Sequence, residues 1–394
     1  MNVREAPRRS HLIFEVKELP ETPWPLTVGG LPFTINSDKN EGRVNIFPRT
    51  MLGDLSISIC QDYNVDSFSD KKFRELGAEV YSWFKQNLPK VRIVELMLTS
   101  ERTIYVFFQN DRYGRQAYYQ RFELPGKIAG CVVRYADGRA LQRPLSPEPP
   151  AAMLQAEPQP ASGVIDNTTC DVPGPGVLVP SKKRARNGEV LVQKNHDVYF
   201  MTAAFYAVGD HGRVLQGDQD RPASLEAPKI PHVGISLLKL KYHIEFANNS
   251  CDTQNLARLA TSEDRLTFDI CFLDSPYAGN LEGTMVGKSV KLIDLESSNT
   301  EDESRYVVYN WCYMGQTEGS EHRVPFSQDT SGSAIWDKYG VVRGFHHHYV
   351  QKGPWSGFSA SVSASELVEA GYTLASVVSS ETSPPPTNKK RRMD

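Results

Sequence analysis

This 394-residue sequence lacks the features of several protein classes. No apolar run approaches the roughly 18 residues of a membrane-spanning helix, so no membrane partner is expected. The first ten residues carry three arginines and lead into no apolar segment, which predicts that the protein is not secreted. The net charge of −3 gives no overall attraction for phosphates, so nucleic acid is not expected as a partner. The sequence predicts a nuclear or cytoplasmic protein.

Cysteine is scarce, and no two cysteines stand in the C-x-x-C spacing typical of zinc and redox sites. The six residues are Cys60, Cys131, Cys170, Cys251, Cys271 and Cys312. In a chain without a secretory signal, such thiols are usually reduced and buried. We therefore expect cysteines in the core, no metal and no cofactor.

Proline is concentrated between residues 144 and 162, where it is mixed with Ala, Glu, Gln and Ser. Such a composition favours an extended, solvated linker. The linker divides the chain into an N-terminal domain, residues 1–143, and a C-terminal domain, residues 163–378. Residues 379–394 contain three consecutive prolines and a basic run, and are expected to form a disordered tail.

The N-terminal domain is predicted to be α+β. A helix is predicted between Ser69, a capping residue, and Leu88, which precedes a proline. Its apolar positions repeat at helical spacing and are Phe73, Leu76, Val80 and Phe84. Strands are predicted for residues 91–98, 103–108 and 116–122. No pattern in this domain indicates a chemistry, so its role stays open.

The C-terminal domain is predicted to be mostly β, because short apolar or alternating runs are separated by turn residues. These runs cover residues 177–179, 190–192, 198–202, 234–240, 266–273, 305–311 and 334–336. Near the end of the domain, Ser363 and Glu366 fit a capping box. The box would open a short helix over residues 366–370 that ends at Gly371.

Four short motifs follow one another in this domain, at residues 174–179, 198–204, 268–273 and 330–333. In this order they resemble the strands and the Ser-Gly-Ser turn of chymotrypsin-like serine proteases of the trypsin and HtrA type. The resemblance covers residues 174–374 and implies an all-β double β-barrel with a catalytic triad. It places Ser331 at the nucleophile, Asp269 at the acid and Phe205 at the general base.

Two departures from that family's pattern predict an inactive protein. A serine hydroxyl needs an adjacent base to take its proton, and the phenyl ring of Phe205 cannot accept one. Loss of one triad member costs on the order of a millionfold in turnover. The resemblance also implies an oxyanion hole at Asp329, Thr330 and Ser331. The family usually has glycine at the first of these positions, and a carboxylate there would repel a developing oxyanion.

Other histidines offer further roles. His196 and His211 lie in turn-like sequence, and either would supply a base if its loop folded into the cleft. In the run of three histidines near the end of the domain, His346 and His348 share one face of a strand. No carboxylate or cysteine stands at ligand spacing, so a metal site is not predicted there. The resemblance places Gly344, His346 and His348 on the strand that lines the specificity pocket, where they would bind an acidic or amide side chain. Partly exposed edge-strand histidines are the alternative.

Two basic runs are candidate contacts for a nuclear import receptor. The first contains Lys182, Lys183, Arg184 and Arg186, and the second contains Lys389, Lys390, Arg391 and Arg392. No aromatic residues are interleaved with them to stack on bases, which argues against contact with nucleic acid.

The sequence leaves three functions open. The first is an inactive trypsin-like serine protease homologue that binds a protein or an extended peptide, since main-chain pairing does not need the triad. The second is an active serine endopeptidase that uses Ser331, Asp269 and an unconventional base. The third is a β-rich adaptor unrelated to that family.

Overall fold

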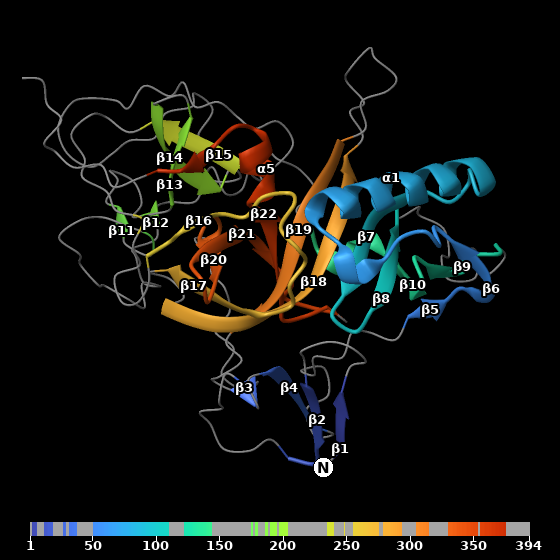
Figure 1. Ribbon diagram of the computed structural model, residues 1–394. Helices are drawn as coiled ribbons and strands as arrows, with labels where there is room; N and C mark the ends of the chain where they lie inside the picture. The colour runs from blue at the N-terminus through green and yellow to red at the C-terminus, as the bar shows by residue number, and fades with distance from the viewer. Residues whose placement is uncertain are drawn as a thin grey trace, which may run out of the picture.

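Figure 1 shows the computed structural model of the chain, which is mostly β with few helices. The structure describes residues 2–5, 12–18, 27–28, 31–37, 50–109, 122–143, 175, 178–179, 186–187, 190–194, 197–203, 235–239, 248, 255–275, 279–293, 305–314, 330–353 and 355–375. Within these ranges, no helix is both long enough and apolar enough to cross a membrane.

The helix α1 (Asp70–Asn87) confirms the helix predicted for the N-terminal region. Ser69 caps it, because the Ser69 hydroxyl oxygen accepts a hydrogen bond from the backbone N–H of Lys72 at 3.4 Å. The helical conformation ends at Leu88, where the following proline disfavours another turn. Sequence-local signals therefore set both ends of this helix.

One face of α1 covers a sheet of the N-terminal region. Its strands are β5 (Met51–Leu52), β6 (Asp54–Ile59), β7 (Ile93–Thr99), β8 (Thr103–Phe108), β9 (Pro125–Ile128) and β10 (Cys131–Asp137). They lie in the order β7-β8-β10-β9-β6, with β5 beside β10. β7 and β8 confirm two predicted strands, whereas the strand predicted for residues 116–122 falls almost wholly outside the described residues.

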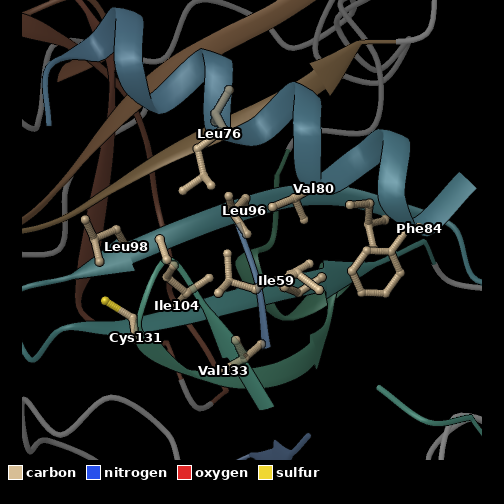
Figure 2. Close-up of a cluster of buried hydrophobic side chains, with 14 of the residues drawn as sticks. Ile59, Leu76, Val80, Phe84, Leu96, Leu98, Ile104, Cys131 and Val133 are labelled. Atoms are coloured by element: carbon tan, nitrogen blue, oxygen red, sulfur yellow. The ribbon is translucent and has the colours of Figure 1, made fainter. Parts of the chain in front are cut away.

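Apolar side chains fill the space between α1 and this sheet (Figure 2). Figure 2 shows residues of the helix above residues of the strands, among them Leu76, Val80, Phe84, Leu96, Ile104 and Val133. All six are at most 3% exposed. The burial of these side chains holds the helix on the sheet.

The C-terminal region contains a closed barrel of six strands. These are β17 (Ile270–Ser275), β18 (Gly279–Ile293), β19 (Arg305–Met314), β20 (Ala334–Asp337), β21 (Val341–Tyr349) and β22 (Phe358–Ser363). The strands pair in the order β17-β20-β21-β22-β19-β18, and β18 pairs again with β17. Residues from opposite sides of this ring meet in its interior, including Leu273, Met285, Cys312 and Ile335. The mostly β character predicted for this region is confirmed.

A second sheet of the C-terminal region has the order β15-β14-β13-β23. Its strands are β13 (Leu191–Lys194), β14 (Asp197–Ala203), β15 (Ile235–Lys239) and β23 (Thr373–Leu374). The short strands β11 (Leu178–Val179) and β12 (Arg186–Asn187) pair with each other, and β16 (Arg258–Leu259) pairs with β21. A second closed barrel stays a prediction, because much of residues 163–254 lies outside the described ranges.

β18 belongs to the barrel and also to the N-terminal sheet. Residues 279–284 of β18 pair with β17, and residues 287–291 pair with β7. The change of partner coincides with a bulge between Met285 and Gly287 in the pairing of β18 with β19. In Figure 1, β18 and β19 accordingly lie between β7 and the remaining barrel strands. The regions before and after residues 144–162 are thus joined by one continuous sheet.

A buried polar cluster also joins α1 to the barrel. Asp70, in the first turn of α1, pairs with Lys288 of β18. Asp70 also accepts hydrogen bonds from the hydroxyls of Ser363, at 2.5 Å, and Ser365, at 2.6 Å. Burial acts to raise the pKa of the Asp70 carboxyl, but the Lys288 ammonium and the two hydroxyls hold that pKa below its usual value.

The short helix α5 (Ser365–Glu369) forms without the predicted capping box, so that prediction was wrong. Its N-cap residue makes no side-chain hydrogen bond, and the hydroxyl of Ser363 is used by the polar cluster. The Glu366 carboxylate accepts the backbone N–H of Val308 at 2.9 Å and pairs with Arg74 at 2.7 Å. Both side chains of the expected box have partners distant in sequence, which local reasoning does not reveal.

The described cysteines are free thiols, as the sequence analysis predicted. Cys131, Cys271 and Cys312 are buried and Cys60 is half-buried. Cys170 and Cys251 lie outside the described residues.

Candidate functional site

The turn that carries Ser331 is fixed to β21 by backbone hydrogen bonds. The N–H of Gly332 donates to the carbonyl of His346 at 2.7 Å, and the N–H of His346 donates to the carbonyl of Ser333 at 2.8 Å. Gly332 has a φ of +101°, which glycine adopts at little cost. The expected nucleophile therefore lies on a well-fixed turn directly before β20.

The Ser331 hydroxyl donates a hydrogen bond to the carbonyl oxygen of His347 at 3.2 Å. A backbone carbonyl accepts hydrogen bonds but is far too weak a base to take the proton of a hydroxyl at neutral pH. This contact therefore does not activate the serine. Thr330, directly before it, is fully buried, and within the described ranges its hydroxyl oxygen has no hydrogen-bond partner.

Asp269 lies at the surface rather than in the buried position that the resemblance implies. Its side chain is 31% exposed and its carboxylate pairs with the Lys338 ammonium at 3.2 Å. The same carboxylate accepts the N–H of Ile270 at 2.9 Å. Asp269 precedes the first residue of β17, so its side chain leaves the barrel wall and meets a lysine in the β20–β21 turn.

The register of β17 on β20 separates Asp269 from Ser331. Cys271 lies opposite Asp337, the last residue of β20, so Asp269 lies beyond that end of the strand. Ser331 precedes the other end. A strand of four residues is about 13 Å long, so the structure does not bring the two expected triad members together.

Asp274, which no sequence motif singled out, lies at the end of β17 that is closer to the serine turn. Its neighbour Leu273 is opposite Ile335, the second residue of β20. Asp274 is 7% exposed, in contrast to Asp269. Both carboxylates flank the same apolar run, and only the strand pairing, which is not local in sequence, distinguishes the two.

The histidine side chains of β21 take part in hydrogen bonds inside the protein. The Ser359 hydroxyl and Nδ1 of His346 are 2.7 Å apart. Nε2 of His348 lies 3.2 Å from the carbonyl oxygen of Leu141, and Nδ1 of His348 lies 3.0 Å from Nδ1 of His347. A carbonyl only accepts, so Nε2 of His348 carries the proton. In the neutral ring Nδ1 of His348 is then an acceptor, and His347 donates to it.

Burial keeps these imidazoles neutral. His346 and His348 are 3% and 9% exposed. Burial lowers the pKa of His346 to about 3. Burial and the nearby Arg143 guanidinium also lower the pKa of His348 well below its usual value. The alternative of exposed edge-strand histidines does not fit these two residues.

The expected alternation of the histidines is interrupted by a bulge. Ser361 is opposite His346 and Ala360 is opposite His348, so His347 has no opposing residue on β22. The expectation that His346 and His348 share a face assumed a regular strand, and it fails here: His346 contacts Ser359, whereas His348 contacts His347 and a carbonyl of the N-terminal region.

Gly344 makes a close backbone approach inside the barrel rather than lining an open surface. A Cβ at this position would lie 2.5 Å from the carbonyl oxygen of Val362 and 2.9 Å from the side-chain nitrogen of Asn310. No ordinary side chain fits there without a shift of the backbone. The structure thus explains this glycine by packing.

Several expected site residues lie outside the described residues. These are Phe205 and Asp329, the alternative bases His196 and His211, and the basic residues Lys182, Lys183, Arg184, Lys389, Lys390, Arg391 and Arg392. Of the basic runs, only Arg186 belongs to a described strand, β12. The roles expected for these residues stay predictions.

Comparison with known proteins finds no matching family model and no matching curated protein. Among solved structures, the chain is similar to a glutamic-acid-specific serine protease that uses a histidine triad in substrate binding. The TM-score is 0.31, with 14% identity over 51% of this chain and 100% of that one. Protease A of Thermobifida fusca has a TM-score of 0.33 and 10% identity, over 52% of this chain and 99% of that one.

A chymotrypsin of Cellulomonas bogoriensis is similar to the same extent, with a TM-score of 0.32 and 13% identity. The similarity covers 52% of this chain and 98% of that one. These low TM-scores and identities do not establish membership of a family, and no activity follows from them.

Proposed function

We propose that this protein is a catalytically inactive homologue of trypsin-like serine proteases that binds a protein or an extended peptide. The hydrogen bond from Ser331 Oγ to the carbonyl oxygen of His347 carries the proposal. Within the described residues, this hydroxyl has no hydrogen bond to an imidazole or a carboxylate. The resemblance places Phe205 where a base is required. Together, this position and the contact with His347 support a serine whose hydroxyl proton is not taken up by any base.

The backbone that follows β21 supports the binding part of the proposal. The side-chain amide of Gln142 binds it as a peptide group would. Its oxygen accepts the N–H groups of Gln351, at 3.1 Å, and Lys352, at 3.3 Å, and its nitrogen donates to the carbonyl of Lys352 at 2.7 Å. Gln142 already fills these groups, so we infer that the bound polypeptide makes the same kind of main-chain pairing elsewhere on the strands of this region.

Labelling with a fluorophosphonate probe tests the absence of catalysis. The probe reacts with serines activated by a base, so we expect no labelling of the protein or of its Ser331→Ala variant, with trypsin as the positive control. Labelling of the natural protein that disappears in Ser331→Ala would establish the alternative, an active serine endopeptidase.

Fluorescence anisotropy with labelled extended peptides tests the binding. Replacing a central peptide residue by proline removes one main-chain donor. Proline-substituted peptides should therefore bind more weakly than their parents. Equal affinity for parent and proline-substituted peptides would exclude main-chain pairing as the mode of binding.

A further inference from the structure

A group of charged side chains lies where the N-terminal sheet meets the barrel, close to the serine turn. Glu95 of β7 and Lys291 of β18 are direct cross-strand partners. Arg143 binds Glu95 through two nitrogens, at 2.7 and 2.5 Å, and its guanidinium carbon lies 3.9 Å from the ring centroid of Tyr309. The ring of His347 packs edge-on against the same tyrosine, with centroids 5.8 Å apart.

This group has an excess of positive charge. Both oxygens of Glu95 are used by Arg143, and within the described residues Lys291 forms no ion pair. Burial and the nearby Arg143 charge lower the pKa of Lys291 to about 8. Two cations thus share one carboxylate in a largely buried place, where charges are normally paired.

Arg143 also has an unused donor. Its side chain is 10% exposed, and Nη1 is buried without a hydrogen-bond partner among the described residues. The large majority of buried polar side-chain atoms have such a partner. Nη1 of Arg143 therefore lacks an acceptor at the same place where the two cations lack a second negative charge.

We propose that Arg143 and Lys291 bind a carboxylate group supplied by an acidic side chain of the bound polypeptide. One carboxylate oxygen accepts from Nη1 of Arg143 and the other from Nζ of Lys291, two charge-assisted hydrogen bonds. Lys291 and His347 are only partly buried, so the ligand approaches from their side. This inference rests on the proposed binding function, because the carboxylate belongs to the polypeptide that the protein is proposed to bind. The site is connected to the serine turn through His347, whose backbone oxygen accepts the hydrogen bond of Ser331.

The position of Arg143 does not depend on the ligand. The preceding residue, Gln142, is held to the backbone after β21 by three hydrogen bonds, and the carbonyl of Leu141 contacts His348. The guanidinium is therefore already in place before a carboxylate binds, and the entropy lost on binding is correspondingly small.

Acetate titration of the full chain, followed by NMR of the lysine side-chain carbons, tests the anion site without a peptide. The Lys291→Met variant identifies the Lys291 signal. We expect a saturable shift of this signal and a rise in the pKa of Lys291, since a carboxylate favours the charged form. Chloride at equal ionic strength and the exposed Lys71 serve as controls. If the Lys291 signal shows no saturable change, the proposal is overturned. This includes the case in which a carboxylate of the chain already fills the site.

Peptide binding then tests the source of the carboxylate. A labelled peptide with one central glutamate should bind at least about tenfold more tightly than the same peptide with glutamine. Lys291→Met should remove this preference, whereas Arg139→Met, which removes an exposed arginine of the same segment, should retain it. Equal binding of both peptides overturns the carboxylate site but leaves the proposed function standing. A saturable acetate site without binding of either peptide contradicts the proposed function instead.

Discussion

Asp70 and Lys288 form an ion pair across 218 positions of sequence, and they connect the first turn of α1 with β18 of the barrel. Their side chains are 3% and 10% exposed. Removing one member of a buried pair leaves the other charged and without its partner. The N-terminal helix and the barrel are therefore expected to unfold together.

Asp70→Asn should destabilise the protein strongly, because the amide cannot neutralise Lys288. We expect a loss of about 3–5 kcal/mol in the free energy of unfolding. Urea denaturation followed by circular dichroism measures it. The control is Glu263→Gln, which breaks the exposed pair with Lys71 and should change the free energy of unfolding far less, because solvent screens that pair. Equal losses in the two variants would show that the buried pair has no special role.

Stability should fall as the pH is lowered below about 6.5. His346 has a pKa of about 3 in the folded protein, against about 6.5 when unfolded. Between these values the unfolded chain binds a proton at His346 and the folded protein does not. The free energy of unfolding therefore decreases by about 1.4 kcal/mol for each pH unit from this residue alone.

His346→Gln should reduce this pH dependence by that amount. Denaturation curves at pH 7, 6 and 5 give the slope for each protein. The slope is the decisive quantity, since a uniform loss of stability from the substitution leaves it unchanged. An identical slope in the variant would mean that His346 is protonated in the folded state.

Gly344→Ala should be far more harmful than Gly287→Ala, although both glycines lie on barrel strands. At Gly344 the added methyl would lie 2.5 Å from the backbone oxygen of Val362. At Gly287 the nearest atom is 3.4 Å away, an ordinary contact. We expect the free energy of unfolding to fall by about 1–3 kcal/mol in Gly344→Ala and by less than about 1 kcal/mol in Gly287→Ala. Thermal unfolding compares them, and similar melting temperatures would contradict the close approach.

Residues 163–378 should not fold as a separate fragment. Without the N-terminal region, β18 loses its partner β7 and Lys288 loses Asp70. The exposed strand edge is expected to promote aggregation. Co-expression with residues 1–162 should restore a soluble complex. A cooperative unfolding transition of the isolated fragment, with the stability of the full chain, would disprove this dependence.

The parts of the fold predicted from sequence are those encoded by neighbouring residues. The helix at Asp70–Asn87 has a regular apolar stripe and a capping serine directly before it. The strand at Thr103–Phe108 is a short apolar run with turn residues before it, and the structure reproduces its bounds. For these elements the local pattern and the tertiary packing favour the same conformation.

The features of the fold and the site that could not be predicted from the sequence are those set by the pairing of distant strands. The contact between β7 and β18 joins segments that are about 190 residues apart in the sequence, and no local pattern encodes it. The same limit applies to Asp269, which was chosen by its motif but is placed at the far end of β20 by its register. The bulge at His347 likewise depends on β22, a strand that follows later in the chain.

The change of partners along β18 has an evolutionary meaning. Because one strand completes the barrel with its first half and bonds to β7 with its second half, recombination at the proline-rich segment would separate pieces that hold each other in register. A gene encoding only one piece would yield a product in which a strand edge is left without its hydrogen-bonding partner. The two pieces are therefore expected to be inherited together.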